Sequence, residues 1–273
     1  MALLAERPSA LLADATAVLE SAGCDTPRLD AELLLASALG CDRARLVTRR
    51  AVPVPAAFET LLARRAAREP VAYILDAKEF RRISLSVDRR VLIPRPETEL
   101  LVEVGLGLPS GARVVDVGTG SGAVALALKD ERPDLDIVGT ERSQDALAVA
   151  RHNAARLGLQ VEFLLGDLLA PVLAAGTSCD AVLANLPYVE EGTELPPDVA
   201  LYEPHGALFG GGDGLEVIRR LIDTVPAHVS LLALELDPRQ AVTVAALIQR
   251  TGFTEIDVLQ DLAGHDRVVV GRR

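Results

Sequence analysis

The sequence predicts an α/β protein: a doubly wound, mostly parallel sheet preceded by a small helical domain and a β-hairpin connector. Two patterns predict this. Apolar residues recur at helical spacing in residues 1–70, and strand and helix patterns alternate after residue 112. Such alternation is typical of parallel sheets covered by helices on both faces. A chain of 273 residues with 49% hydrophobic residues is long enough to bury a core in each part.

Residues 1–70 are expected to form the helical domain. Three segments carry apolar residues at helical spacing, and helix-ending glycines follow the first two. Ser9 is a candidate cap for the first helix. The three expected helices span residues 9–23, 27–39 and 55–68.

Residues 71–93 change to a two-residue period, which predicts a hairpin-like connector. Val71, Tyr73 and Leu75 recur at every second position, and so do the apolar positions of the ISLSV stretch at 83–87. A helix then begins near Pro96, because proline is favoured in a first helical turn.

Residues 94–273 form the third predicted part, with seven expected strands. The last two strands are joined by a segment too short for a crossover helix, so they run antiparallel. A parallel sheet whose chain ends in one reversed strand is typical of the methyltransferase variant of the doubly wound, Rossmann-like fold. The strand sequences include ARVVDVG, LDIVGTE, QVEFLLGD, DAVLAN, SLLALELD, FTEIDVLQ and DRVVVGRR.

Charge and composition argue against several functions. The net charge is −11, and residues after 85 carry 16 Lys plus Arg against 28 Asp plus Glu. Tight binding to naked nucleic acid usually requires a basic face, so no direct nucleic-acid partner is expected. The three cysteines form no CxxC pair and the four histidines are scattered, so no metal is expected. Without an apolar run near 18 residues or a leader pattern, we expect a cytoplasmic protein without a membrane partner. A monomer is a separate expectation.

The first strand of the sheet ends in a glycine-rich loop, DVGTGSG. Glycines allow sharp turns and close approach of a ligand. With Ala123 the loop also fits the dinucleotide spacing, so a dehydrogenase remains an alternative. Glu141 ends the next strand, where a carboxylate can accept hydrogen bonds from ribose hydroxyls. The candidate cofactor-binding loop comprises Gly118, Thr119, Gly120, Ser121 and Gly122.

Two further strand ends carry candidate ligand residues. Asp167 can accept a hydrogen bond from an adenine amino group, and Leu168 can cover the ring. Asn185 ends another apolar strand in Asn-Leu-Pro-Tyr. Its amide oxygen and the carbonyl of Leu186 can converge on one –NH2 group, because Pro187 holds Leu186 extended. Tyr188 offers a flat face, so this site suits an amino group attached to a π-system and favours methyl transfer over hydride transfer.

The chain resembles the glutamine N5-methyltransferases of peptide-chain release factors over nearly its whole length. The resemblance implies S-adenosylmethionine as methyl donor and the glutamine of the Gly-Gly-Gln motif of bacterial class 1 release factors as substrate. It is carried by RLDAELLLASALG (28–40), REPVAYIL (68–75), VLIPRPETELLVE (91–103), DVGTGSGAVALAL (116–128), ALAVARHNAARLGL (146–159), EPHGALFGGGDGLEVIRRLI (203–222) and DLAGHDRVVVGRR (261–273).

The resemblance also implies roles for single residues. The helical domain helps to dock the release factor. Independently of the resemblance, we expect Pro96 and Thr98 to lie near the cofactor and Arg95 and Glu97 to be structural. The cofactor site is expected to contain the glycine loop, Glu141, Asp167, Leu168 and Asn185, and the glutamine amide site Asn185, Leu186, Pro187 and Tyr188.

Several positions depart from the family pattern and leave alternatives open. Leu186 stands where proline is usual, Glu141 where aspartate is usual, and Leu168 where an aromatic residue is common. Asn-Leu-Pro-Tyr is also used by adenine methyltransferases, so an adenine N6-methyltransferase acting on RNA or DNA is one alternative. A non-catalytic, partner-binding protein that retains the fold is another.

Overall fold

The computed structural model describes residues 5–6, 8–48, 52–53 and 55–273. The chain divides into two compact units. The first comprises Met1–Asp76 with Leu195–Tyr202, and the second comprises Ala77–Glu194 with Glu203–Arg273. The boundaries expected at residues 70 and 93 remain predictions. Residues 1–4 and 49–51 of the expected helical domain lie outside the described ranges.

The first unit is helical, as the sequence predicts. The expected helices at 9–23, 27–39 and 55–68 are observed with slightly shifted ends. The first begins at Pro8, so Ser9 lies inside its first turn, and Gly23 follows its end with a positive φ of 73°. The elements of this unit are β1 (Ala5–Glu6), α1 (Pro8–Ser21), α2 (Pro27–Ala38), α3 (Arg43–Thr48), β2 (Val52–Pro53), α4 (Ala56–Ala66), α5 (Val71–Ile74) and α10 (Pro197–Ala200).

A buried ion-pair network links α2, α4 and α10 inside this unit. The guanidinium of Arg65 lies 2.6 Å from Asp30 and 2.7 Å from Asp198. The side chains of Arg65 and Asp30 are only 5% and 6% exposed. Because a buried charge is costly without a partner, this network attaches residues 195–202 to helices that lie more than 100 residues earlier in the chain.

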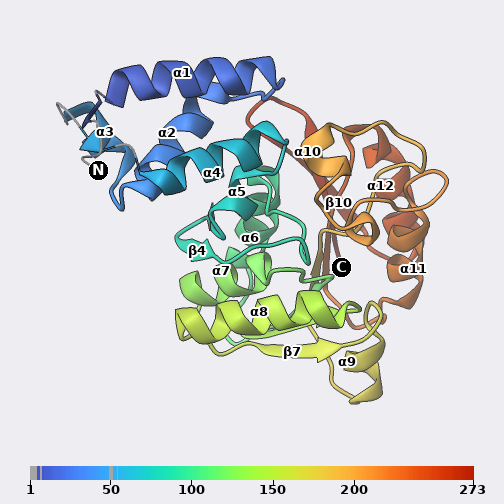
Figure 1. The fold of residues 1–273 in the computed structure, drawn as a ribbon. Coiled ribbons are helices and arrows are strands. Elements are labelled where there is room, and N and C mark those ends of the chain that lie inside the picture. Colours follow the sequence, from blue (N-terminus) through green and yellow to red (C-terminus); the bar gives the residue numbers. More distant parts are fainter. Residues whose placement is uncertain (1–4, 7, 49–51, 54) are drawn as a thin grey trace. The chain divides into compact units, whose positions relative to one another are not determined.

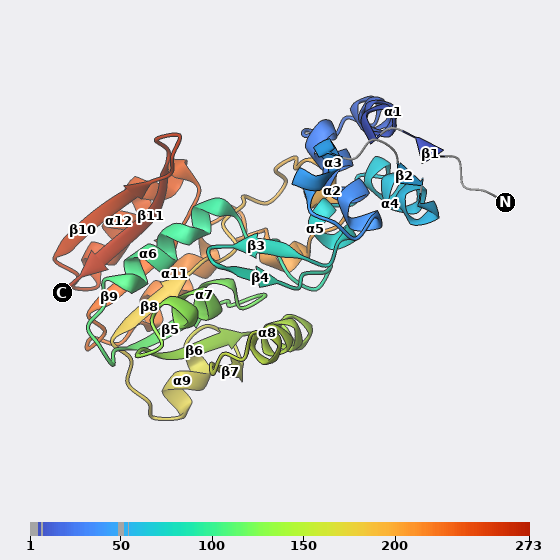
Figure 2. The same ribbon diagram turned by 90° about the vertical axis from the view of Figure 1, so that its left-hand side faces the viewer.

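The expected strand at residues 71–75 is wrong. Val71 begins the short helix α5, and its apolar residues Tyr73 and Ile74 are buried. Pro70 precedes this turn and its carbonyl accepts from the amides of Tyr73 and Ile74, so local hydrogen bonds replace strand pairing. The hairpin of the connector is present in the second unit (Figure 2), formed by β3 (Lys78–Phe80) and β4 (Ile83–Leu85).

A seven-stranded sheet of order β10-β11-β9-β8-β5-β6-β7 forms the centre of the second unit, which confirms the predicted Rossmann-like fold. Helices cover both of its faces (Figure 1). One face carries α6 (Glu99–Leu106), α7 (Ala123–Glu131) and α8 (Gln144–Leu157), and the other carries α9 (Ala170–Ala174), α11 (Glu216–Thr224) and α12 (Ala241–Arg250). The strands are β5 (Arg113–Val117), β6 (Asp136–Glu141), β7 (Glu162–Leu165), β8 (Ala181–Ala184), β9 (Leu231–Glu235), β10 (Glu255–Gln260) and β11 (Asp266–Arg272).

The last strand, β11, runs antiparallel to both of its neighbours, as predicted for the final hairpin. It does not lie at the edge of the sheet but between β9 and β10. Its central residues Val268, Val269 and Val270 are fully buried, whereas every residue of β10 is exposed or half-buried. The continuous apolar run takes the interior place, since such strands are covered on both faces.

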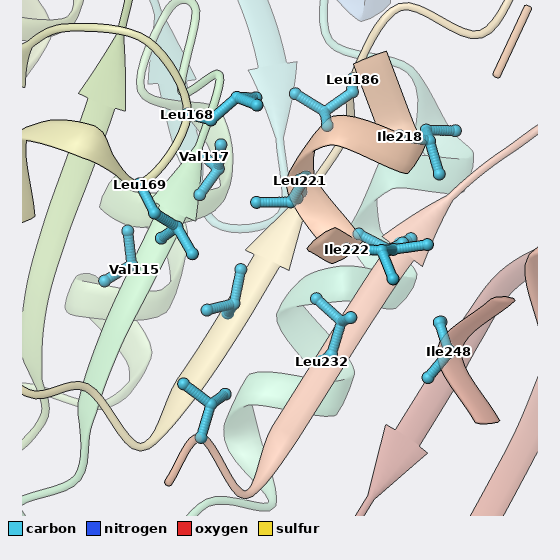
Figure 3. Packing of buried hydrophobic residues seen from close by; sticks show 14 of the residues in the cluster. Val115, Val117, Leu168, Leu169, Leu186, Ile218, Leu221, Ile222, Leu232 and Ile248 are labelled. Carbon is cyan, nitrogen blue, oxygen red and sulfur yellow. The ribbon is translucent and has the colours of Figure 1, made fainter. Parts of the chain in front are cut away.

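An aliphatic core fixes the strands that carry the candidate site. Val115, Val117 and Leu232 of the sheet pack in one cluster with Ile218 and Leu221 of α11 (Figure 3). Leu168 and Leu186, which follow β7 and β8, belong to the same cluster. Because protein interiors are closely packed, the loops at these strand ends begin from rigid positions.

Candidate functional site

The candidate site lies at the carboxyl ends of the parallel strands. The register pairs Val117 of β5 with Ala184 of β8, and Ala184 with Leu234 of β9. Gly118 and Asn185, the next residues of β5 and β8, therefore leave the sheet at the same level. This is the edge at which open parallel sheets bind their ligands.

Two glycines of the loop after β5, Gly118 and Gly122, leave little room for a side chain. Gly118 and Gly122 have positive φ values of 73° and 84°, which other residues rarely adopt. A Cβ atom on Gly118 would lie 3.1 Å from the Leu186 side chain, and one on Gly122 would lie 2.8 Å from the Leu126 side chain. The loop thus presents bare backbone, which a cofactor can approach closely.

The buried carboxyl group of Asp116 holds this loop in place through hydrogen bonds. Asp116 accepts a 2.6 Å hydrogen bond from the Thr119 hydroxyl and a 3.2 Å bond from the amide of Ala125. Burial raises the pKa of Asp116 to about 6, although these hydrogen bonds lower it. Asp116 therefore joins the end of β5 to the first turn of α7, a role that the sequence reasoning missed.

Glu141 lies beside the loop, where the sequence predicts it. One carboxylate oxygen accepts from the amide of Gly120 at 3.1 Å, and the other accepts from the amide of Ser143 at 2.9 Å. Each carboxylate oxygen accepts about two hydrogen bonds, so capacity remains for ligand hydroxyls. These bonds hold the carboxylate in a fixed orientation.

Asp167 and Leu168 follow β7 at the same edge. Leu168 is almost fully buried and adopts a positive φ of 49°, which is unusual for a residue with a side chain. The Asp167 carboxylate forms an ion pair with Arg220 of α11. This ion pair takes up part of the acceptor capacity that the sequence reasoning assigned to an adenine amino group.

Asn185 ends β8 with its side-chain amide held in place. Its Nδ2 donates to the hydroxyl of Thr98 at 3.0 Å, and this leaves the amide oxygen for a ligand. Leu186 is buried against Gly118, and Tyr188 donates through its hydroxyl to Glu235 at 3.4 Å. Burial raises the pKa of Tyr188 to values outside the physiological range.

A cavity of about 320 Å³ opens between these strand ends, which is within the range of small-ligand sites. Most of the candidate residues line it, whereas Gly122, Pro96 and Tyr188 lie outside the lining. The predicted residues in the lining are Thr98, Gly118, Thr119, Gly120, Ser121, Glu141, Asp167, Leu168, Asn185, Leu186 and Pro187. Further lining residues, which the sequence reasoning missed, include Arg90, Leu92, Pro94, Arg142, Pro204 and Gly206.

The glycine run at 210–214 packs on the backbone of the Asn-Leu-Pro-Tyr segment. A Cβ atom on Gly210 would lie 2.4 Å from the Pro187 carbonyl oxygen, and one on Gly214 would lie 2.2 Å from the Tyr188 carbonyl oxygen. Such distances leave no space for any side chain. The glycine run therefore packs directly against the backbone of Pro187 and Tyr188 and restricts its position.

Glu203 anchors the loop that precedes α6. Its side chain is buried, accepts from the amide of Ile93 at 3.2 Å and pairs with Arg95 at 2.5 Å. This agrees with the structural role expected for Arg95. The pair attaches Arg95, which does not line the cavity, to the EPHG segment, whose Pro204 and Gly206 do line it.

Two general properties complete the description. Among the described residues, no group of three His, Cys, Asp or Glu side chains is arranged to hold a metal ion. In the same part of the chain, no helix is both long and apolar enough to cross a membrane.

Comparison with known proteins gives the family. A profile of the PrmC N-terminal domain matches residues 10–75, and one of the methyltransferase small domain matches residues 96–201. A release factor glutamine methyltransferase of Mycolicibacterium smegmatis is 43% identical over 95% of both chains. One of Cereibacter sphaeroides is 42% identical over 93% of this chain and 94% of its own. The chain belongs to the release factor glutamine methyltransferase family.

Membership of this family decides between the classes that the sequence left open. The chain is an S-adenosylmethionine-dependent methyltransferase and not a dehydrogenase or a non-catalytic binding protein. The catalytic part also shares its fold with a 16S rRNA methyltransferase of Thermus thermophilus, at 16% identity and a TM-score of 0.53, over 72% of this chain and 49% of that one.

The glycine cradle and Glu141 fit the cofactor of this family. The cavity, the unobstructed backbone at Gly118 and the oriented carboxylate suit a ligand with a ribose and an extended polar chain. The residues that the sequence reasoning missed, such as Asp116 and Glu203, act through loops rather than through a motif. Both residues stand out in the structure because they are buried. The sequence around a single acidic residue does not reveal whether that residue is buried.

Proposed function

We propose that this chain transfers a methyl group from S-adenosylmethionine to the N5 amide nitrogen of the glutamine in the Gly-Gly-Gln motif of bacterial class 1 peptide-chain release factors. The names of the relatives support this substrate over an adenine in RNA or DNA. The observation that carries the proposal is the fixed amide of Asn185, whose Nδ2 is bound by Thr98 while the amide oxygen remains for a substrate –NH2 group.

The residues at the strand ends have complementary roles in this proposal. The loop from Gly118 to Gly122 holds the cofactor through its backbone, Glu141 binds the ribose hydroxyls, and Leu168 covers the adenine. Asp167 contributes an acceptor for the adenine amino group, and Pro96 and Thr98 border the same site. When bound, S-adenosylmethionine supplies a methyl group on a positively charged sulfur.

Asn185 and Leu186 prepare the glutamine for methylation. An amide nitrogen is a poor nucleophile, because its lone pair is delocalised into the carbonyl group. Two hydrogen bonds from the –NH2 group, one to the Asn185 amide oxygen and one to the Leu186 carbonyl oxygen, favour a more pyramidal nitrogen and fix its direction. Orientation of this kind can contribute up to ~7–11 kcal/mol. Pro187 and Tyr188 keep the two acceptors in place, and the nitrogen releases its proton to water.

The proposal also covers docking of the substrate, oligomeric state, location and nucleic-acid binding. The helical unit docks the release factor, and the chain acts as a monomer in the cytoplasm without binding nucleic acid directly. The net charge of −11 supports the last point, because phosphate binding requires basic residues. A purified sample should therefore have the mass of one chain in solution.

The test uses labelled S-adenosylmethionine and two purified release factors, one normal and one with the Gln of Gly-Gly-Gln replaced by Ala. Label is expected on the first and not on the second. Equal labelling of both would contradict the glutamine assignment. Binding of the cofactor without transfer to either would leave the methyltransferase family intact and reject this substrate.

A further inference from the structure

Glu235 is a buried acidic residue beside the candidate site that the proposed mechanism does not use. It is the last residue of β9 and only 1% exposed. Its Oε1 accepts from the Tyr188 hydroxyl at 3.4 Å, and its Oε2 is buried without a hydrogen-bond partner among the described residues. A buried carboxylate oxygen without a partner is costly, so this atom requires an explanation.

The sheet register brings Glu235 next to the substrate-binding amide. Ala184 pairs with Leu234 across β8 and β9, so the following residues, Asn185 and Glu235, leave neighbouring strands at the same level. Thr98 stands beside both of them. Its hydroxyl oxygen accepts from Asn185 Nδ2 at 3.0 Å, and its hydroxyl lies close enough to Glu235 to lower the pKa of that carboxyl.

The Thr98 hydroxyl has one hydrogen to donate. The oxygen already accepts from Asn185, so the hydrogen is available for an acceptor in the same buried pocket. Thr98 is itself only 4% exposed, so its hydroxyl has little contact with bulk solvent. The Oε2 atom of Glu235 is a buried acceptor that lacks a donor, and the Thr98 hydroxyl is a donor near enough to lower the pKa of Glu235.

We propose that Glu235 is a positioning residue that sets the direction of a hydrogen-bond chain from Asn185 through Thr98 to Glu235 Oε2, and thereby decides which end of the Asn185 amide faces the substrate. This inference rests on the proposed function. It adds to it the group that makes the Asn185 oxygen, rather than its nitrogen, the end presented to a substrate –NH2 group.

The chemical reason lies in what each group can donate. An ionised carboxylate only accepts, so Thr98 must donate to it and must accept from Asn185 Nδ2. The Asn185 oxygen is then the free end. A group that can donate, such as glutamine or a protonated carboxyl, allows the whole chain to reverse. The Asn185 –NH2 would then face the substrate –NH2, donor against donor, and the acceptor would be lost.

The charges around Glu235 make this arrangement sensitive to pH. Burial raises the pKa of Glu235 to about 7, and the carboxylate of Glu97 on the 3₁₀ turn Pro96–Thr98 also raises it. Three neighbouring groups lower this pKa: Thr98, the Tyr188 hydroxyl and Arg267 of β11. The ionised form, which only accepts, dominates above this value. Activity should therefore be high above the pKa and fall as the pH drops through it.

The test compares Glu235→Gln with the wild-type enzyme, using transfer of labelled methyl to the release factor between pH 6 and 9. A matched control is Glu255→Gln, which alters an exposed glutamate on the edge strand β10. We expect kcat/KM of Glu235→Gln to fall at least about tenfold at pH 8, which corresponds to ~1.4 kcal/mol. The fall in activity as the pH drops through about 7, which we call the acid limb, should disappear in this variant. Its affinity for the cofactor, measured by calorimetry, should stay within twofold of the wild-type value.

A second pair of variants keeps the test decisive if Glu235→Gln fails to fold. Thr98→Val removes the hydroxyl at nearly constant volume, with Thr243→Val on the exposed face of α12 as its control. We expect the same loss of kcat/KM. Glu97→Gln removes a neighbouring negative charge and should move the acid limb of the otherwise normal enzyme to lower pH.

Opposite results separate this inference from the proposed function. If the wild-type enzyme methylates the release factor but Glu235→Gln and Thr98→Val keep kcat/KM within twofold at pH 8, the positioning role is rejected while the substrate stands. An acid limb that persists unchanged in Glu235→Gln also rejects it. If the wild-type enzyme transfers no methyl group to the release factor, the proposed function itself fails.

Discussion

The side-chain nitrogen of Asn185 donates to the hydroxyl of Thr98 at 3.0 Å, although 87 residues separate the two in the chain. Asn185 ends β8, and Thr98 ends the 3₁₀ turn that precedes α6. The bond holds the amide in one orientation before any substrate arrives. In the proposed function, the segment around Pro96 therefore supports the substrate side of the site through Thr98 as well as the cofactor side.

Replacing Asn185 with Ala should abolish turnover and leave the fold intact. The substitution removes the acceptor that orients the substrate –NH2 group, so we expect kcat to fall by about 10²-fold or more. Single-turnover transfer to the release factor measures this, with calorimetric binding of S-adenosylmethionine as the control. A variant with a nearly normal rate would contradict the positioning mechanism.

Replacing Gly118 with Ala should weaken cofactor binding. The positive φ of 73° costs a residue with a side chain roughly 1–2 kcal/mol, and the new Cβ would lie 3.1 Å from Leu186 at the cavity wall. Gly158→Ala is the matched control, because Gly158 has a φ of 69° with nothing within 4 Å of a Cβ atom. Both variants should lose similar stability, and only Gly118→Ala should lose cofactor affinity. Equal affinities in the two variants would contradict a role for this loop in binding.

Replacing Gly210 with Ala should displace the substrate-binding segment. Its Cβ would lie 2.4 Å from the Pro187 carbonyl oxygen, so the backbone at Pro187 must move. Small displacements of catalytic groups can cost up to about 10²-fold in rate, and we expect kcat/KM to fall at least about tenfold. Gly212→Ala, whose Cβ would meet only Glu216 at 3.9 Å, should retain near-normal kinetics. Equal rates for the two variants would show that the glycine run does not position the site.

Replacing Asp30 with Ala should destabilise the helical unit. The substitution leaves Arg65 buried with fewer partners, and breaking a buried pair costs about 3–5 kcal/mol. Asp42→Ala is the control, since the exposed side chain of Asp42 pairs with Arg45 at 3.9 Å, and exposed pairs contribute at most about 1 kcal/mol. Urea unfolding monitored by circular dichroism compares the free energies of unfolding. Equal midpoints for the two variants would show that the network does not hold this unit together.

Local patterns in the sequence were enough to predict the fold class and many of the residues that line the cavity. Hydrophobic periods identify α1, α2 and α4 and the strands of the sheet, because burial of one face imposes a fixed spacing. The glycine loop, Glu141 and Asn185 follow strands directly, and parallel strands bring their carboxyl ends to one edge. These are short-range relations, which a single sequence records.

Only the tertiary structure decided how distant segments support the site. Residues 71–75 were expected to form a strand, but Val71–Ile74 form a helical turn, in which the carbonyl of Pro70 accepts from the amides of Tyr73 and Ile74. The pairing of Asn185 with Thr98 and of Glu203 with Arg95, and the packing of Gly210 on Pro187, join residues up to 108 positions apart. Burial of Glu235 depends on the sheet order. Contacts of this kind depend on how the elements pack, and no local spacing in the sequence encodes them.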